Sequence, residues 1–421
     1  MTDHNATDSS RLAAETSSRL AAETSSRLAA ETNVVVIGGG YAGTTAANHL
    51  RMRTDVNITL VNPRPKFVER IRLHQHAAGN YDATVDYGTL LGEGVALVVD
   101  NATRIDTAAR KVELASGAAL DYDHLIYAVG STGVAPWSVP GAAEFAYPIG
   151  ELEYAQQLRA KLAELRPGAP ITVVGAGLTG TETAAELAEH GHAVTLVCGG
   201  NLVPSLSEQG RRYTARWLKR HGVTVLDGPG SKVVEVTSGS VLLDSGRRLF
   251  SMATIWTAGF GVPDLAAHSG LRTDGLGRLL TDETLTSVDD PRIVAAGDSA
   301  SPSGHPLRMS CQAAGPLGAQ AANTVLSRIA GTAPAVIDQA FVGSCVSLGR
   351  HAATVQLARK DDTPVRYYLR GRLGASVKEA ICKGTLWGLR REARKPGSTF
   401  VVRGGKRPEQ PVLEPQVVTE S

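Results

Sequence analysis

The sequence has few cysteines and no long hydrophobic run. No apolar stretch approaches the roughly twenty residues that a membrane-spanning helix requires. The first 32 residues lack an apolar core, so no secretory signal is expected there. None of the cysteines forms a closely spaced pair of the kind that a redox disulfide or a zinc site needs, so neither a disulfide nor a metal is expected and a reducing cytoplasm is favoured. The cysteines are Cys198, Cys311, Cys345 and Cys382.

Charge and aromatic content are also low. Charged residues make up 20% and aromatic residues 5% of the 421 residues, and the formal net charge is only +2. A chain with so little excess charge is not expected to bind nucleic acid. Basic residues nevertheless outnumber acidic ones in residues 341–421, which could meet an anionic lipid surface, a partner or only water. The length and the 43% hydrophobic content fit a soluble α/β enzyme of two or three domains.

Residues Ser9–Thr32 repeat the octapeptide Ser-Ser-Arg-Leu-Ala-Ala-Glu-Thr three times without change. On an α-helix, an eight-residue period rotates each leucine by about 80° from the previous one, so the leucines form no continuous seam. We therefore predict that residues 1–32 are a disordered, solvated arm. A segment that binds a partner is the alternative.

What the sequence does contain is one pattern used twice. The β-branched runs Asn33–Ile37 and Ile171–Val174 each lead into Gly-x-Gly-x-x-Gly, at residues 38–43 and 175–180, and then into an alanine-rich stretch. In such a strand, turn and helix, the first glycine makes the turn, the second admits a pyrophosphate, and the third lets helix pack on strand. The helix N-terminus favours the negative charge. Two motifs predict two dinucleotides and electron transfer between them.

A second shared pattern follows each glycine motif. Leu114–Leu120 and Leu243–Leu249 each predict a hairpin with a Ser-Gly turn, and each precedes an apolar strand that ends in small residues. These ends are Ala128-Val129-Gly130 and Ala258-Gly259, where small residues would let the backbone approach a flat ligand closely. Two unrelated hairpins are the alternative.

A third element is the strand Arg292–Ala296, which leads into Gly297-Asp298. An acidic side chain at the carboxyl end of such a strand lies at the rim where α/β sheets bind ligands. It could accept hydrogen bonds from sugar-like hydroxyls, or it could belong to an ordinary turn. After two nucleotide motifs, we interpret it as a contact to the ribityl chain of a flavin.

Together, the glycine motifs, Ala128–Ser131, Trp256–Gly259 and Gly297-Asp298 resemble the pyridine nucleotide-disulfide oxidoreductase superfamily. Within that superfamily the resemblance is to the branch of type II NADH dehydrogenases and apoptosis-inducing-factor-like oxidoreductases, and it covers residues 33–330. It implies an α/β fold with two doubly wound Rossmann-like domains, the first holding FAD and the second NAD(P)H, followed by a smaller C-terminal region.

The implied division of the chain begins with the repeat arm. The ranges are 1–32 for the arm, 33–149 and 253–330 for a discontinuous FAD-binding domain, 150–252 for an NAD(P)H-binding domain, 331–402 for a C-terminal interface domain, and 403–421 for a tail.

The resemblance also implies which residues hold FAD. Asn62 stands where a carboxylate usually meets the adenosine ribose, and it can form hydrogen bonds without carrying charge. Arg70 lies in a stretch implied to pass beside the flavin, where a cation would balance negative charge. Arg72 and His74 are alternatives to Arg70, and all three could instead be solvated. The implied FAD contacts are Gly38, Gly40, Tyr41, Ala42, Gly43, Asn62, Arg70, Ala128, Gly130, Gly297 and Asp298.

In the second site, Glu182 follows the last glycine by two residues. The resemblance implies that its carboxylate orients the nicotinamide as a catalytic residue, whereas a first-turn glutamate that complements the helix dipole is the alternative. No acid follows the next strand, which ends at Val197-Cys198, and Arg211 and Arg212 could neutralise the 2′-phosphate of NADPH or be solvated. NADH remains the family expectation. The other implied contacts are Gly175, Gly177, Leu178, Thr179, Gly180, Ala258 and Gly259.

The electron acceptor must approach the flavin itself, because no cysteine pair can carry electrons onward. Type II NADH dehydrogenases have an Ala-Gln pair and a second Gln at their quinone site. Cys311-Gln312 matches the first half, while Gly315-Pro316 replaces the second Gln. We expect Gln312 to contact a quinone or another small acceptor, with Cys311 either beside it or simply buried. A ferredoxin-type protein acceptor and a non-catalytic redox-sensing role are the alternatives.

After residue 341 short apolar runs favour a β-rich domain, and Val377–Lys395 predicts a helix. Lys383 and Arg390 fall on one face of this helix, with Ile381 and Trp387 mostly opposite. A basic amphipathic helix with a tryptophan can lie on a membrane surface, here its inner face. Packing against the enzyme body is the alternative, and a homodimer stays an open expectation.

Overall fold

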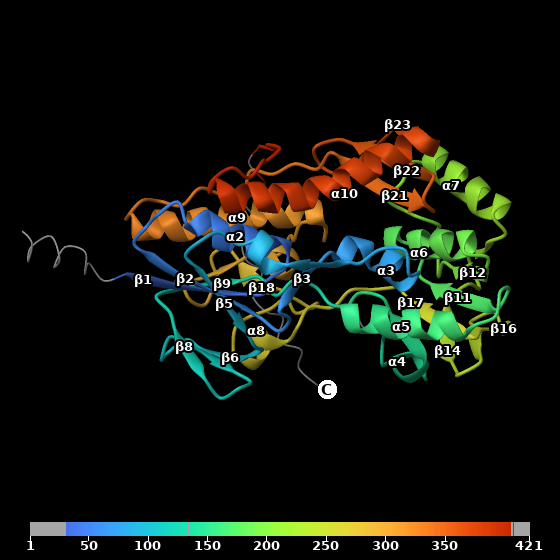
Figure 1. The fold of residues 1–421 in the computed structure, drawn as a ribbon, viewed down its shortest axis with the longest axis horizontal. Coiled ribbons are helices and arrows are strands. Elements are labelled where there is room, and N and C mark those ends of the chain that lie inside the picture. The colour runs from blue at the N-terminus through green and yellow to red at the C-terminus, as the bar shows by residue number, and fades with distance from the viewer. Residues whose placement is uncertain (1–30, 134, 406, 408–421) are drawn as a thin grey trace, which may run out of the picture.

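The computed structural model describes residues 31–133, 135–405 and 407, so the predicted repeat arm and most of the predicted tail lie outside the described residues. Two parallel sheets lie side by side in the molecule, and a C-terminal layer runs along one side of both (Figure 1). This arrangement is the predicted α/β architecture with two doubly wound domains.

The first parallel sheet combines the start of the described chain with a strand from far downstream. Each neighbouring pair of its strands is parallel. Parallel strands that are covered on both faces need apolar residues on both sides, and the run from Val34 to Ile37 is buried throughout. Because one strand follows the second glycine motif, the first domain is discontinuous. The order is β19 (Ile293–Ala295), β9 (His124–Tyr127), β1 (Thr32–Ile37), β2 (Val56–Asn62) and β5 (Val95–Val99).

The second parallel sheet has the same plan. It takes in β10 and β17, so it extends by one strand on either side of the range 150–252 expected for the second domain. The chain passes into this half of the molecule through helix α5 (Leu152–Glu164). Helix α6 (Leu178–Glu189) follows the second glycine turn. The order is β10 (Ala146–Pro148), β17 (Ala253–Trp256), β11 (Pro170–Val174), β12 (Ala193–Val197) and β13 (Thr224–Leu226).

Both predicted hairpins are confirmed within small antiparallel sheets. Their turns place Gly117 at φ +87° and Gly246 at φ +80°, a backbone region that glycine occupies without steric cost. The two sheets are β6 (Ala102–Asp106), β7 (Lys111–Leu114) and β8 (Ala119–Asp121), and β14 (Val233–Val236), β15 (Ser240–Leu243) and β16 (Arg248–Phe250).

Helices α2 (Tyr41–Leu50) and α9 (Cys311–Ile329) pack closely beside the first sheet. A Cβ on Gly318 of α9 would stand 2.2 Å from the Ala42 carbonyl oxygen, so only glycine permits this approach. The other elements that precede the C-terminal region are short, apart from α7. They are α3 (Leu73–Ala77), α4 (Ala142–Phe145), α7 (Glu208–Arg220), α8 (Leu265–His268), β3 (Lys66–Val68), β4 (Thr84–Asp86), β18 (Leu279–Thr281), β20 (Ala300–Pro302), η1 (Arg70–Arg72), η2 (Tyr87–Thr89) and η3 (Gly297–Ser299).

The C-terminal region forms an antiparallel sheet of β21 (Gly343–Leu348), β22 (Ala352–Ala358) and β23 (Pro364–Arg370), followed by α10 (Gly371–Arg394). Helix α10 contacts this sheet at one end and α2 at the other, so it bridges the molecule lengthwise (Figure 1). The helix starts six residues earlier than the sequence predicted. Among the described helices, none is long and apolar enough to cross a membrane.

The orientation of α10 differs from the sequence prediction. The helix packs through a stripe at four- and three-residue spacing that includes Cys382, Leu386 and Leu389, all buried. Ile381 and Trp387, which were expected to oppose the charged face, are 41% and 56% exposed. One face of α10 therefore packs on the enzyme body, as one of the two alternatives held, and another presents apolar side chains outward. Contact of that outward face with a membrane stays a prediction.

Candidate active site

The first glycine turn has the geometry of a dinucleotide cradle. Gly38 has φ +100° and donates its N–H to the Val61 carbonyl at 2.8 Å. A Cβ on Gly38 would stand 2.4 Å from the Ala128 oxygen, and one on Gly43 would stand 1.8 Å from the Gly38 oxygen. Gly40, in contrast, has no atom within 4 Å of a built Cβ. The first and third glycines are thus required by close packing, and the second faces open space.

The second turn repeats this geometry. Gly175 has φ +100° and donates its N–H to the Val197 carbonyl at 2.8 Å. A Cβ on it would stand 2.7 Å from the Ala258 nitrogen, and one on Gly180 would stand 1.8 Å from the Gly175 oxygen. Gly177 again faces open space, ahead of Leu178 and Thr179 in the first turn of α6.

Both turns leave helix donors unused. Gly40 and Gly177 are the N-caps of α2 and α6, and neither helix has a side-chain cap. The free N–H groups of a helix start form a ready site for a phosphate. The residues at both turns therefore fit a dinucleotide. The small strand ends Ala128 and Ala258 pack against the first glycines, and their close approach to a flat ligand stays a prediction.

Asn62 lies at the first turn but is engaged by the chain itself. Its Oδ1 accepts the Gly39 N–H at 2.9 Å, and its Nδ2 donates to the Arg64 carbonyl at 2.7 Å. Tyr87, which sequence reasoning missed, donates its hydroxyl to the Gly39 carbonyl at 2.6 Å. Asn62 and Tyr87 together hold both polar groups of Gly39 and so fix the turn. A contact of Asn62 with a ribose stays a prediction.

The structure brings Arg70 together with two other predicted segments. The Arg70 guanidinium donates to the Ser131 carbonyl at 2.5 Å and to the Gly150 carbonyl at 3.0 Å. Ser131 in turn donates its hydroxyl to Asp298 Oδ2 at 2.7 Å. Arg70 also lies 3.9 Å from a Cβ built on Gly130, and Gly297 packs against Ala42 of α2. The expected FAD contacts at the strand ends thus form one connected group.

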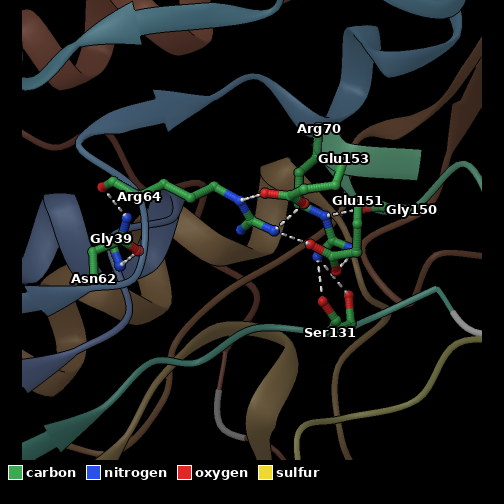
Figure 2. A network of polar contacts seen from close by, with 8 residues as sticks. All are labelled: Gly39, Asn62, Arg64, Arg70, Ser131, Gly150, Glu151 and Glu153. Atoms are coloured by element: carbon green, nitrogen blue, oxygen red, sulfur yellow. Dashed lines mark hydrogen bonds and ion pairs between the residues drawn. The ribbon is translucent and has the colours of Figure 1, made fainter. Parts of the chain in front are cut away.

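A neighbouring ion-pair network was not foreseen from the sequence. Arg64 binds both carboxylate oxygens of Glu153 at 2.7 Å and one oxygen of Glu151 at 2.9 Å. Glu151 also approaches Arg70 at 3.8 Å. Figure 2 shows that the network leads from Gly39 and Asn62 through Arg64 to the start of α5 and on to Ser131. It links the first glycine turn to the segment that enters the second domain.

Glu182 occupies a buried polar cluster under the C-terminal helix. Its carboxylate lies 2.9 Å from Lys378 Nζ of α10 and accepts the Ser347 N–H at 2.9 Å and hydroxyl at 3.1 Å. His74 of α3 lies 3.9 Å from Glu182 through Nδ1 and 3.5 Å from the Ser347 hydroxyl through Nε2. We call His74, Glu182, Ser347 and Lys378 the Glu182 cluster. Its members come from four separate elements.

The pKa values in the Glu182 cluster reflect burial and pairing. Burial acts to raise the pKa of Glu182, but the Lys378 ammonium and His74 outweigh burial and lower it. Burial likewise acts to lower the pKa of Lys378, but Glu182 outweighs burial and raises it well above its usual value. Burial lowers the pKa of His74 to about 4. At neutral pH the cluster therefore holds an ionised pair beside an uncharged imidazole.

Lys378 was missed by the sequence analysis, although a signal was present. It lies four residues before Cys382 in the buried stripe of α10, where a lysine needs a partner. Its partner Glu182 was singled out for a different reason. Only the fold brings the two together, because the separation in sequence is almost two hundred residues.

Gln312 lies in the first turn of α9, whose N-cap is Ser310. In the amide orientation that satisfies both of its ends, its nitrogen donates to the Gly343 carbonyl at 3.2 Å and its oxygen accepts the Val342 N–H at 3.0 Å. Gln312 therefore ties α9 to β21, and its contact with an acceptor stays a prediction. Cys311 is half-buried, and burial raises the pKa of its thiol.

Tyr41 starts α2 and packs edge-on against Phe67, with ring centroids 5.0 Å apart. Its hydroxyl is buried, and among the described residues it meets no partner in hydrogen-bonding geometry. Burial, together with the nearby Cys311 and Glu69, raises the pKa of Tyr41 well above its usual value. The hydroxyl is buried at the start of α2, beside the first cradle, and the contact of Tyr41 with FAD stays a prediction. In the same described part of the chain, no group of three His, Cys, Asp or Glu side chains could hold a metal ion.

Two parallel sheets that each present the same glycine cradle define a protein that binds two dinucleotides. Residues 32–321 match the model of the pyridine nucleotide-disulphide oxidoreductase family. The chain belongs to this family, and it is an NAD(P)H oxidoreductase that uses FAD.

Known relatives agree with this membership. An NADH dehydrogenase-like protein of Mycobacterium tuberculosis is 34% identical over 325 residues, which cover 70% of this chain and 80% of that protein. The type II NADH:quinone oxidoreductase of the same organism is 29% identical over 379 residues, covering 77% and 79%. Among solved structures, the sulfide:quinone oxidoreductase of Aquifex aeolicus superposes with a TM-score of 0.73 at 20% identity, covering 87% and 93%. At this identity, the last likeness concerns the fold alone.

Proposed function

We propose that the protein is an NAD(P)H dehydrogenase that passes electrons to a quinone-like acceptor. The first cradle, with Asp298 and the small strand ends, would hold FAD, and the second would hold NAD(P)H. When bound, FAD accepts a hydride from NAD(P)H and passes two electrons to the acceptor. Similarity to an NADH:quinone oxidoreductase supports a quinone, as does the lack of any closely spaced cysteine pair.

The observation that carries the proposal is the ionised Glu182–Lys378 pair under the C-terminal helix. Reduction of a quinone by NAD(P)H consumes one proton for each quinol formed, in addition to the hydride. A buried site must supply that proton from a group with a polar partner of its own. Lys378 Nζ carries the proton, and after giving it up the amine would be reprotonated from water, because Glu182 is ionised and His74 is uncharged at neutral pH. We assign Lys378 to proton supply and Glu182 to holding the Lys378 ammonium in place, with Gln312 at the nearby start of α9.

The outward face of α10 supports contact with a membrane surface, where quinones are dissolved. Ile381 and Trp387 are exposed along this helix, and the Arg391 guanidinium lies 5.3 Å from the centroid of the Trp387 ring. Lys383 and Arg394 of the same helix are exposed as well. A helix that exposes both apolar and cationic side chains fits an anionic lipid surface. Peripheral attachment through residues 377–395 therefore belongs to the proposal, and a homodimer stays a prediction.

A direct test uses the FAD-loaded protein. NADH should bleach the flavin absorbance under anaerobic conditions, and a soluble quinone should restore it. Lys378→Met should bleach at the wild-type rate and reoxidise at least tenfold more slowly, because one proton source is lost. Lys378→Arg checks folding, and Lys383→Met provides an exposed control. Quinone reoxidation of Lys378→Met at the wild-type rate would refute the proton role.

The acceptor class has its own test. Vesicles that contain anionic lipid should co-sediment the protein, and Trp387→Ala should weaken this binding more than Trp137→Ala, which removes a tryptophan that is 87% exposed elsewhere. A ferredoxin-like protein acceptor would instead give turnover that falls steeply with salt and no vesicle binding. That result would replace the quinone by a redox protein.

A further inference from the structure

The duplication provides an internal guide to the adenosine ribose in the second site. Gly38 donates to Val61, and Gly175 donates to Val197, both at 2.8 Å. The residues that follow, Asn62 and Cys198, therefore occupy equivalent places at the end of the second strand of each sheet. A polar or acidic side chain is normally required at this place to bind the ribose hydroxyls.

Cys198 cannot supply that contact well. Its thiol is half-buried, and burial together with the charge of Asp227 raises its pKa to about 12. A neutral thiol is a weak hydrogen-bonding group. Beyond it, Gly199 and Gly200 have no atom within 4 Å of a built Cβ, so the space beside the strand end is open.

The neighbouring strand brings a carboxylate to the same place. β12 and β13 run parallel, with Val197 opposite Leu226. Cys198 donates its N–H to the Leu226 carbonyl at 2.8 Å, and Gly228 donates to the Gly200 carbonyl at 2.9 Å. These two hydrogen bonds hold Asp227 beside the segment that begins at Cys198. The Asp227 side chain is exposed and, among the described residues, has no hydrogen bond or ion pair.

Two arginines of α7, Arg212 and Arg216, have other neighbours than the end of β12. Arg212 forms an ion pair with Glu208 one turn earlier on α7. Arg212 and Arg216 also line a groove of about 520 Å³ together with Tyr368 of β23, on the side of the C-terminal sheet. Of the two arginines considered for the 2′-phosphate of NADPH, only Arg211 remains without such a contact.

We propose that Asp227 determines specificity by accepting hydrogen bonds from the adenosine ribose of NADH and repelling the 2′-phosphate of NADPH. Asp227 follows β13 and takes the role of the acid that is missing after β12, where Cys198 stands. This inference rests on the proposed assignment of the second cradle to NAD(P)H. A carboxylate that binds two hydroxyls discriminates strongly, because the phosphate adds like charge at the same point.

The test is binding. The FAD-loaded protein, kept anaerobic with its flavin already reduced so that no hydride transfer follows, is titrated with NADH and NADPH while protein fluorescence and the melting temperature are followed. The wild type should bind NADH at least tenfold more tightly than NADPH. Asp227→Asn should weaken NADH binding by about tenfold, since a charge-assisted hydrogen bond is lost, and should leave or improve NADPH binding. Asp121→Asn, an exposed carboxylate on β8, should change neither.

Each contrary result has a separate meaning. An unchanged NADH to NADPH ratio in Asp227→Asn would overturn the inference. So would a wild type that prefers NADPH and loses this preference in Arg211→Ala. If the wild type binds neither nucleotide, or if Gly177→Val binds NADH as well as the wild type does, the assignment of the second cradle fails first.

Discussion

Lys378 of α10 lies 2.9 Å from Glu182, the carboxylate that follows the second glycine turn. The C-terminal helix therefore places the Lys378 ammonium against Glu182 of α6, in the half of the molecule that contains the second glycine turn. The same helix reaches α2 of the first domain and carries an exposed apolar face on its outer side. Helix α10 thus contacts both helices that follow the glycine turns, α2 directly and α6 through Glu182, and its outer side is the surface that we propose for the acceptor.

Removing Lys378 should cost more stability than removing an exposed lysine. Lys378→Met leaves Glu182 buried without its main partner, which typically costs about 3 to 5 kcal/mol. Lys383→Met, four residues from Glu379 on the same helix and 74% exposed, should cost less than about 0.5 kcal/mol. Urea unfolding of both variants at pH 7 measures the difference.

The sign of the pH dependence follows from the two shifts. Glu182 has a lowered pKa, so its stabilisation is present above its unfolded value of about 4.3 and is lost as pH falls through the folded pKa. Lys378 has a raised pKa, so its stabilisation is present below about 10.4 and is lost as pH rises through the folded pKa. The gap between wild type and Lys378→Met should therefore be widest between these limits. A gap that is constant from pH 3 to pH 8 would contradict the pairing.

His74 predicts a second pH effect. Its folded pKa of about 4 lies below the ordinary value near 6.5, so the unfolded chain binds the proton more readily. Stability should fall as pH drops from 6.5 towards 4, by about 2 kcal/mol between pH 7 and pH 5. His74→Gln should remove this part of the slope in urea unfolding. His268 is exposed, so His268→Gln serves as the control. If the slope of stability against pH is unchanged in His74→Gln, the difference in proton binding between the folded and unfolded chain comes from another group.

Much of the fold was readable from the sequence because it depends on local rules. The glycine turns, the hairpins around Gly117 and Gly246, and the strand before Asp298 each carry their signal within a few residues. The Glu182 cluster, in contrast, joins four elements, and nothing near Ser347 or Lys378 indicates which carboxylate they meet. The outward position of Trp387 likewise depends on which side chains of α10 pack against the rest of the enzyme, and the helix sequence alone does not determine this.

The two cradles should be separable by substitution at their open glycines. Gly40 and Gly177 have φ −75° and −69°, which any residue adopts, and a Cβ meets no atom there. Gly40→Val should fold but lose the yellow colour of FAD, whereas Gly177→Val should keep FAD and bind NADH at least tenfold more weakly. Gly239→Val, another open position, should do neither. A yellow Gly40→Val protein would place FAD outside the first cradle.

The Arg64 network should stabilise the junction between the domains in a salt-dependent way. Arg64→Gln removes three charge-assisted hydrogen bonds to Glu151 and Glu153, but Arg64 is 29% exposed and solvent screens much of their strength. We therefore expect a loss of about 1 kcal/mol in the free energy of unfolding at low salt.

Most of that loss should disappear in 1 M NaCl, where the screening length falls to about 3 Å. Arg53→Gln breaks a pair with Asp55 that is similarly exposed but lies within one domain, and it should cost less. Because the network positions the segment that enters the second domain, Arg64→Gln should also slow flavin reduction by saturating NADH, measured by stopped flow, while Arg53→Gln should not. Equal reduction rates in the two variants would limit the Arg64 network to a structural role.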